Sequence, residues 1–166
     1  FVKAVQPYPV QILDTRKTTP TLRRFEKYAV HCGGGTNHRM GLYDMALLKD
    51  NHRTLWREQG RGGLAEAVSA VRHRFPGVPV EVEVETLEEF LEVLPARPEW
   101  ILLDNMSLDL MKECVRRKTA GVLLEASGNV TLERAPAIAA TGVDAISIGA
   151  LTHSAPAADL SLEVVE

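Results

Sequence analysis

Five basic side chains in the first part of the sequence could bind an anion. Arg16 and Lys17 come soon after a short apolar run. His38 and Arg39 follow three consecutive glycines, and Lys49 directly follows a second apolar run. An arginine can clamp a carboxylate or a phosphate through two parallel hydrogen bonds, whereas a lysine acts as a point charge. These residue types predict a pocket for a strongly anionic ligand.

The charge distribution agrees with such a pocket without requiring it. The first 62 residues carry 11 lysines and arginines against 5 acidic residues, although the whole chain has a net charge of −3. A basic region of this kind attracts anions, but solvated surface charge explains the asymmetry equally well. A nucleic-acid surface is disfavoured, because the basic residues form no single run and aromatic residues make up only 5 % of the chain.

Carboxylates stand at the ends of two other β-rich runs. Glu83 and Asp104 occupy these positions, and Glu81 lies two residues before Glu83. A pocket that binds only phosphate has no need of acids. Carboxylates would hold Mg²⁺ carried by a polyphosphate, bind ribose hydroxyls, or stabilise positive charge developing on a sugar ring. The mixture of cations and acids therefore predicts an anionic substrate that also contains a sugar or a metal ion.

Two glycine turns fit a phosphate group. Ser127, Gly128 and Asn129 follow one apolar run, and Gly149 follows the last one. Backbone N–H groups in a turn between a strand and a helix can hold a phosphate, although a glycine at such a turn is more often structural. The glycines of residues 33–35 fit either a helix end or a close approach of the backbone to a ligand.

The elements that must position these residues are short strands alternating with helices. Most of the β-rich runs are continuously apolar, which is typical of parallel strands covered on both faces. One run alternates valines with Glu81 and Glu83, as expected of a strand with one face toward a polar cavity. The expected strands are Val10–Leu13, Ala46–Leu48, Val78–Val84, Trp100–Leu103, Gly121–Leu124 and Ala145–Ile148.

Amphipathic stretches between these runs predict helices. Thr86, Ser107 and Asn129 are expected to cap three of them, and Arg53–Gly63 is expected to be a loop. The alternation predicts a parallel α/β fold, either a small barrel or an open sheet. The chain has 166 residues, which is too few for the roughly 250 of an eight-stranded barrel. The helices are expected at residues 20–31, 63–75, 86–94, 107–119 and 131–141.

The position of the polar residues predicts one shared site. Each expected strand is followed by charged, polar or glycine residues, and ligands of parallel α/β folds bind at the carboxyl ends of the strands. Of the histidines, His38 is favoured as a site residue because Arg39 and the glycines flank it. His52 is an open case, because it ends the run that begins at Lys49.

Several classes of protein are excluded. No apolar run approaches the roughly 18–20 residues of a membrane span, and no signal peptide is visible. Cys32 and Cys114 lie far apart, which excludes a disulfide scaffold or a zinc ribbon and makes a reducing, cytoplasmic environment the expectation. The sequence contains no nucleophile elbow, Walker A loop or dinucleotide-binding GxGxxG motif.

Taken together, the motifs resemble quinolinate phosphoribosyltransferase, and the resemblance covers nearly the whole chain. The first four of the segments named below form a highly specific combination. The segments that carry the resemblance are Asp14–Pro20, Cys32–Gly35, Asn37–Leu42, Lys49–His52, Glu81–Glu85, Leu103–Asn105, Glu125–Asn129 and Ser147–His153.

The resemblance implies a fold and a reaction. It implies a parallel six-stranded α/β barrel, similar to a TIM barrel but short of eight strands. The implied reaction transfers the 5-phosphoribosyl group of phosphoribosyl pyrophosphate to quinolinate, with decarboxylation, and gives nicotinate mononucleotide, pyrophosphate and CO₂ for NAD biosynthesis. Mg²⁺ is the implied cofactor and accompanies the pyrophosphate.

The resemblance also assigns roles to residues. It implies Lys49, Glu83 and Asp104 as catalytic residues, with Glu83 and Asp104 also as the possible Mg²⁺ ligands. The cationic pocket would bind the dicarboxylate and phosphates, and the two glycine turns would hold the 5-phosphate. The implied substrate-binding residues are Thr15, Arg16, Lys17, His38, Arg39, Lys49, Glu83, Asp104, Ser127, Gly128, Asn129, Ile148, Gly149 and Ala150.

One part of the family pattern is missing from the sequence. Residues 1–166 correspond to the barrel catalytic domain, and the family's N-terminal sandwich domain is absent. The resemblance implies a homodimer or larger assembly, in which that domain of a partner subunit completes the site. Two alternatives stay open: a related phosphoribosyltransferase for another carboxylated ring, and a barrel that binds a phosphate ligand without catalysis.

Overall fold

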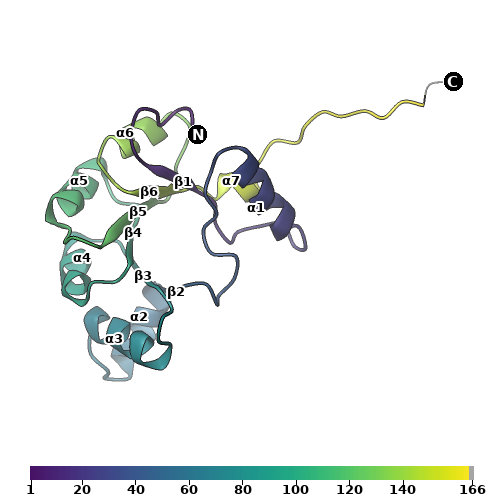
Figure 1. The fold of residues 1–166 in the computed structure, drawn as a ribbon. Coiled ribbons are helices and arrows are strands. Elements are labelled where there is room, and N and C mark those ends of the chain that lie inside the picture. Colours follow the sequence, from purple (N-terminus) through teal and green to yellow (C-terminus); the bar gives the residue numbers. More distant parts are fainter. Residues whose placement is uncertain (165–166) are drawn as a thin grey trace.

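Six parallel strands form the centre of the structure, a computed structural model that describes residues 1–164 (Figure 1). All six expected strands are confirmed: β2 has the predicted bounds, and each of the others has one or both ends shifted by one to three residues. The strands follow an arc, and helices cover its outer side. They are β1 (Gln11–Leu13), β2 (Ala46–Leu48), β3 (Val80–Val84), β4 (Trp100–Asp104), β5 (Leu123–Ser127) and β6 (Ala145–Ser147).

The strands are ordered as in a barrel, but hydrogen bonding does not close the sheet. The order is β1-β6-β5-β4-β3-β2, so the first and last strands are neighbours. Within residues 1–164, β1 and β2 do not pair with each other. Residues 36–45 run between them, and Thr36 makes one parallel bridge to Leu13 of β1. The parallel six-stranded α/β fold is therefore confirmed, as a curved sheet with a gap between β1 and β2.

Helices follow the strands in the expected alternation. Thr86 and Ser107 cap α4 and α5 as predicted, since their hydroxyl oxygens accept the N–H of Glu89 and Leu110. Figure 1 shows α1 and α7 together beside β1. The helices are α1 (Arg23–Cys32), α2 (Asp50–Glu58), α3 (Leu64–Arg74), α4 (Leu87–Val93), α5 (Leu108–Arg117), α6 (Ala135–Ala139) and α7 (Ala150–His153), with a 3₁₀ turn at Leu94–Ala96.

Three local predictions are wrong. The expected loop at Arg53–Gly63 is mostly α2, because the loop-favouring glycines 60, 62 and 63 all lie beyond the end of this helix. The helix expected at residues 131–141 begins only at Ala135, and Asn129 does not cap it, because Gly128 and Asn129 have positive φ angles of 98° and 48° and form a turn. The short helix α7 carried no apolar periodicity and was not expected.

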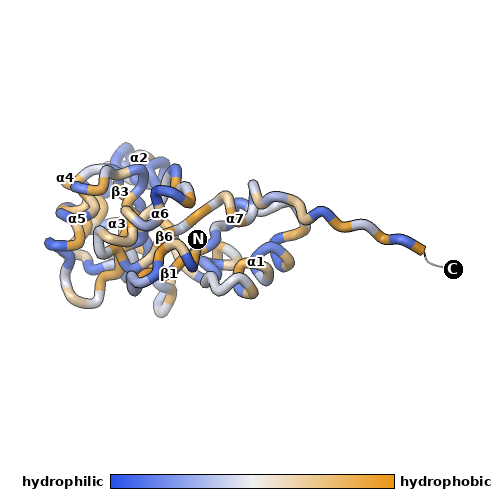
Figure 2. Tube along the Cα trace, turned by 90° about the horizontal axis from the view of Figure 1, so that it is seen from above, coloured by the Kyte–Doolittle hydropathy of each residue, from blue (hydrophilic) through white to orange (hydrophobic). Residues whose placement is uncertain are grey.

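The valines of β3 and the apolar residues of β4 to β6 form the core. Val80, Val82 and Val84 are fully buried on one face of β3, as the alternation predicted. Figure 2 shows the apolar strands at the centre of the folded part and residues 154–164 running away from it. No helix within residues 1–164 is long and apolar enough to cross a bilayer.

Candidate active site

The predicted site residues line two adjoining cavities at the carboxyl ends of the strands. The first, here the cationic cavity, has a volume of about 360 Å³ and contains Thr15, Arg16, Lys17, His38, Arg39, Lys49, Glu83, Asp104 and Ser127. The second, here the glycine cavity, has a volume of about 440 Å³ and contains Gly128, Asn129, Ile148, Gly149 and Ala150. The cavities share Lys17 and Asp104 among their lining residues. The structure therefore brings every predicted site residue to one end of the sheet.

Two arginines lie close together in the cationic cavity. Burial, followed by the positive charge of Arg16, lowers the pKa of Arg39. The Arg39 Nη1 donates to the carbonyl of Met45 at 3.0 Å. The Nε of Arg16 is buried and has no hydrogen-bond partner among residues 1–164. Two neighbouring guanidinium groups with an unused donor are suited to a ligand that carries negative charge.

Lys49 and Glu83 form an ion pair on the opposite side of the same cavity. Lys49 Nζ lies 3.2 Å from the Glu83 carboxylate, and the lysine side chain is 42 % exposed. His52, the open case in the sequence, lines neither cavity. Its Nδ1 accepts the N–H of Lys49 at 3.0 Å and caps the start of α2. The partly exposed pair leaves Lys49 able to reach a ligand.

Asp104 ends β4 between the two cavities. One of its carboxylate oxygens accepts the side-chain amide of Asn105 at 2.9 Å. Glu83 and Asp104 offer the oxygen ligands that Mg²⁺ prefers. Within residues 1–164 neither belongs to a group of three clustered ligating side chains. An ion at these acids would therefore take its other oxygen ligands from water or a substrate.

The turn after β5 gives the glycine cavity its shape. Gly128 has a φ of 98°, and a Cβ there would lie 3.0 Å from the amide nitrogen of Asn105. Among the hydrogen bonds of residues 1–164, none has the N–H of Gly128, Asn129 or Gly149 as donor. Free backbone N–H groups of this kind can bind a phosphate.

Beneath the cationic cavity lies a buried network that sequence reasoning missed. Lys27 and Asp14 form an ion pair, and both side chains are fully buried. The Asp14 carboxylate also accepts the side-chain amide of Asn37 at 2.6 Å and the N–H of His38 at 2.9 Å. Lys27 Nζ donates to the carbonyl of His38 at 3.0 Å. The only sequence signal was a lysine three residues before Val30 on the buried stripe of α1.

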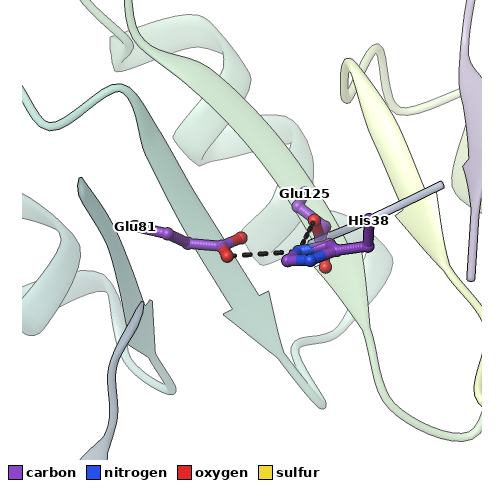
Figure 3. A group of neighbouring side chains, drawn as sticks. All are labelled: His38, Glu81 and Glu125. Atoms are coloured by element: carbon purple, nitrogen blue, oxygen red, sulfur yellow. Dashed lines mark ion pairs between the residues drawn. The ribbon is translucent and has the colours of Figure 1, made fainter. Parts of the chain in front are cut away.

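His38 projects toward two glutamates, as Figure 3 shows. Its Nε2 lies 3.2 Å from a carboxylate oxygen of Glu81 and 3.2 Å from one of Glu125. Glu81 was weighed in the sequence as a carboxylate of the site. Glu125 was expected beyond the end of its strand, but β5 extends to Ser127 and places Glu125 inside the sheet. Strand β5 begins two residues and ends three residues later than the apolar run predicted.

The electrostatics of the three residues are coupled. Burial lowers the pKa of His38, but hydrogen bonds and charges from Glu125 and Glu81 outweigh burial and raise this pKa to about 10. Burial and the charge of Glu125 raise the pKa of Glu81 to about 7. His38 Nδ1 accepts the N–H of Arg39 at 2.8 Å, a bond that the ring makes only while Nδ1 is unprotonated. In this geometry the ring is therefore neutral, with its one proton on Nε2 between the carboxylates. A second proton, which the raised pKa favours, would break the bond to Arg39, and the hydrogen bond rather than the pKa describes the ring in this structure.

A hollow larger than either of these cavities lies elsewhere and has a different character. It has a volume of about 480 Å³ and lies between α2 and α3, against Leu55, Trp56 and Phe75. Of the residues singled out in the sequence, only His52 lines it. The convergence of charged groups, rather than size, therefore distinguishes the two cavities at the strand ends.

Comparisons with known proteins give a consistent family. The family model described as "Quinolinate phosphoribosyl transferase, C-terminal domain" matches residues 1–163. The chain is 46 % identical to the nicotinate-nucleotide pyrophosphorylase [carboxylating] of Mycobacterium leprae, over 99 % of this chain and 57 % of that protein. It is 43 % identical to the probable enzyme of the same name from Bacillus subtilis, over 98 % of this chain and 55 % of that protein.

A solved structure agrees. The nicotinate-nucleotide pyrophosphorylase from Francisella tularensis superposes with a TM-score of 0.84 at 43 % identity, covering 91 % of this chain and 52 % of that one. The chain thus spans little more than half the length of the relatives it matches. The family model, the relatives and the fold point the same way: the chain belongs to the quinolinate phosphoribosyl transferase family and corresponds to its C-terminal domain.

Proposed function

We propose that this chain carries the main part of an active site that joins quinolinate to the 5-phosphoribosyl group of phosphoribosyl pyrophosphate. The supporting observation is the convergence of Arg16, Arg39, Lys17 and Lys49 in one cavity beside the free N–H groups of the glycine cavity. One end of this site suits a dicarboxylate and the other a phosphate. Family membership makes quinolinate the favoured dicarboxylate.

The arginines bind and orient the carboxylates of quinolinate in this proposal. A guanidinium holds a carboxylate by two parallel hydrogen bonds, which fixes the plane of the ring. The bond between ribose C1 and pyrophosphate breaks, and the ring nitrogen bonds to C1. The carboxyl group next to that nitrogen then leaves as CO₂ and a proton takes its place. The role of the protein is chiefly positioning and electrostatic stabilisation.

Glu83 and Asp104 serve the ribose side of the site. Both line the cationic cavity, and Asp104 also borders the glycine cavity. Carboxylates at this position bind ribose hydroxyls and stabilise the positive charge that develops on the sugar as pyrophosphate leaves. Lys49, paired with Glu83, provides a positive charge toward the substrate phosphates. The 5-phosphate occupies the glycine cavity.

Mg²⁺ is the proposed cofactor, bound as a complex with pyrophosphate. When bound, it would neutralise charge on the leaving pyrophosphate. Glu83 and Asp104 are the residues of this chain that would face it, since their oxygen atoms fit a hard cation. The substrate would supply the remaining oxygen ligands.

A domain outside residues 1–166 is proposed to complete the site from a partner subunit. The relatives are nearly twice as long as this chain. Phe25 and Tyr28 on α1, and Leu42 and Tyr43 a few residues after Arg39 in the sequence, are exposed large apolar side chains. An exposed apolar surface is suited to an interface. Sedimentation of the full gene product tests the dimer, which a monomer under assay conditions would contradict.

The cytoplasm is the proposed compartment. Cys32 and Cys114 are both free thiols in the structure, as expected of a protein in a reducing environment. The names of two plant relatives specify mitochondria and chloroplasts. Fractionation of the native cell therefore measures directly in which compartment this protein lies.

Pyrophosphate release is the decisive assay. The full gene product and residues 1–166 alone are each mixed with quinolinate, phosphoribosyl pyrophosphate and Mg²⁺. We expect release of pyrophosphate and CO₂ in equal amounts from the full gene product. Activity only with a different carboxylated ring would make the chain a related phosphoribosyltransferase. Binding of both substrates in calorimetry without turnover by the full gene product would make it a binding protein.

The exchange of Gly128 for alanine tests the phosphate turn. Gly128→Ala places a side chain at a φ of 98° and 3.0 Å from the Asn105 nitrogen. A left-handed backbone costs a non-glycine residue about 1–2 kcal/mol, so the turn shifts. We expect the KM for phosphoribosyl pyrophosphate to rise roughly tenfold, with the Kd of quinolinate unchanged.

Gly77→Ala is the matched control for this exchange. Gly77 has a φ of 83°, but a Cβ there meets nothing within 4 Å and the residue lies outside both cavities. The control introduces the same backbone strain and is expected to change stability without changing either KM. An equal effect of both exchanges on the KM for phosphoribosyl pyrophosphate would contradict the assignment of the 5-phosphate to the glycine cavity.

A further inference from the structure

Two buried glutamates at the cationic cavity have no role in the proposed reaction so far, although Glu125 is one of the residues that line it. Glu81 lies within β3 and is 0 % exposed, and Glu125 lies within β5 and is 1 % exposed. They are separated by β4, yet both approach the same atom, His38 Nε2, at 3.2 Å (Figure 3). His38 belongs to neither strand. It comes from the segment that crosses the gap between β1 and β2.

Packing does not explain the presence of these acids. Glu81 pairs in the sheet with Leu47 and Trp100, and Glu125 pairs with Leu102 and Ala145. Buried carboxylates are costly to desolvate, and apolar residues of similar volume are often as stabilising or more so. The two glutamates are therefore explained better by the group that they contact, the His38 ring.

Every polar group of His38 has a partner in the structure. Its N–H donates to Asp14 at 2.9 Å, and its carbonyl accepts Lys27 Nζ at 3.0 Å. Its Nδ1 accepts the N–H of Arg39 at 2.8 Å, while its Nε2 faces the two glutamates. The ring thus links the interior of the sheet to the main chain of Arg39. If the glutamates release the ring, the hydrogen bond that fixes the start of Arg39 is lost.

We propose that Glu81 and Glu125 are positioning residues that hold the His38 ring and, through it, Arg39 at the carboxylate-binding end of the cationic cavity. This inference rests on the proposed function, since it assigns the two acids to quinolinate binding. Neither acid touches the substrate in this role. The contacts of Nε2 with the two carboxylates are ion-pair distances of 3.2 Å, and the two Glu81 oxygens have no hydrogen-bond partner among residues 1–164. These oxygens are therefore available to accept the Nε2 proton, a role that needs an oxygen acceptor but not a charge.

A divalent cation is the rival occupant of this cluster. His38, Glu81 and Glu125 offer three ligating atoms within 4.8 Å of one another, which a metal ion could bridge. The surrounding charges favour the positioning role. The charges of Glu81 and Glu125 both act on Arg39, so a guanidinium of the chain already stands beside the two acids without an added ion.

Leucine and glutamine exchanges separate these roles. The double variant Glu81→Leu/Glu125→Leu removes both acceptors, and we expect the KM for quinolinate to rise about tenfold or more with kcat changed much less. The double variant Glu81→Gln/Glu125→Gln keeps an oxygen acceptor on each side chain. We expect it to restore the KM to within about threefold of the native value. If the double leucine variant fails to fold, the single variants Glu81→Leu and Glu125→Leu replace it, and we expect smaller rises in the KM for quinolinate.

Three outcomes overturn the proposal. A quinolinate KM unchanged in the leucine variants would make the glutamates structural only. A rise in KM for phosphoribosyl pyrophosphate equal to that for quinolinate would show a general distortion. One equivalent of bound Zn²⁺ or Mn²⁺ in the purified full gene product, lost in the glutamine variant, would make the cluster a metal site. Glu88→Leu, an exposed exchange on α4, is the control expected to leave both KM values unchanged.

A spectroscopic measurement separates failure of this inference from failure of the proposed function. In long-range ¹H–¹⁵N NMR spectra of the full gene product, we expect the His38 Nε2 proton to be protected from exchange. Its protection should be lost in the double leucine variant and kept in the double glutamine variant. If the native protein neither binds nor converts quinolinate, the proposed function has failed, and these spectra still test whether the glutamates hold the ring. Protection that persists in the leucine variant contradicts the positioning role directly.

Discussion

Arg39→Ala is expected to raise the KM for quinolinate by about 100-fold or more, because a carboxylate of the substrate then lies in a partly buried pocket without its main partner. Truncating one member of a buried charge pair costs about 2–5 kcal/mol. The neighbouring Arg16 retains a positive charge but cannot reproduce both hydrogen bonds. The KM for phosphoribosyl pyrophosphate should change far less. Steady-state kinetics of the full gene product, with each substrate varied in turn, provide the measurement.

The controls for this exchange follow from the contacts of Arg39. Arg39→Lys keeps the charge and loses the planar pair of donors, so we expect an intermediate KM. Arg116→Ala removes an exposed arginine on α5, whose partner Glu113 lies far from both cavities, and should have no effect on either KM. Unchanged quinolinate kinetics in a folded Arg39→Ala protein would remove Arg39 from the substrate site.

Lys27→Met is expected to lower the free energy of unfolding by about 3–5 kcal/mol, the largest stability effect we predict. The methionine fills a similar volume, but Asp14 is left fully buried without the cation that neutralises it. Asn37 and the N–H of His38 still donate to Asp14, and they offset only part of that cost. Urea unfolding of the full gene product, followed by circular dichroism, measures the change.

Two further variants isolate the buried ion pair from a general effect of losing a lysine. Lys112→Met removes a lysine that is 58 % exposed and paired with an exposed Asp109, so its effect should stay within about 0.5 kcal/mol. The double variant Lys27→Met/Asp14→Asn removes both charges and should be more stable than Lys27→Met alone. If Lys27→Met costs no more than Lys112→Met, the pair does not carry the stability assigned to it.

The sequence predicted the strands well because their signals are local. Val80, Val82 and Val84 mark one buried face of β3 by alternation alone, and the apolar runs mark β4 and β6 to within one residue. Polar residues at strand ends predicted the cavities because parallel strands bring all their carboxyl ends to the same edge. Each predicted site residue therefore lines a cavity, although its role in the reaction stays a prediction.

Local signals failed where a stretch was polar or where turns shortened an element. Helix α2 has no fully buried residue, and the glycines beyond Gln59 suggested a loop. The turn at Gly128 and Asn129 delayed α6. Strand β5 begins two residues and ends three residues later than the apolar run that indicated it.

The sequence by itself determined the order of the elements, the edge of the sheet at which the charged groups gather, and the family. The tertiary structure alone decided which charges meet beneath that edge. Asp14 meets Lys27 across 13 residues, and His38 meets Glu81 and Glu125 from a segment that crosses the gap between β1 and β2. Such pairings depend on how far the sheet curves and where its gap lies, and these properties follow from the packing of the whole chain rather than from any local pattern.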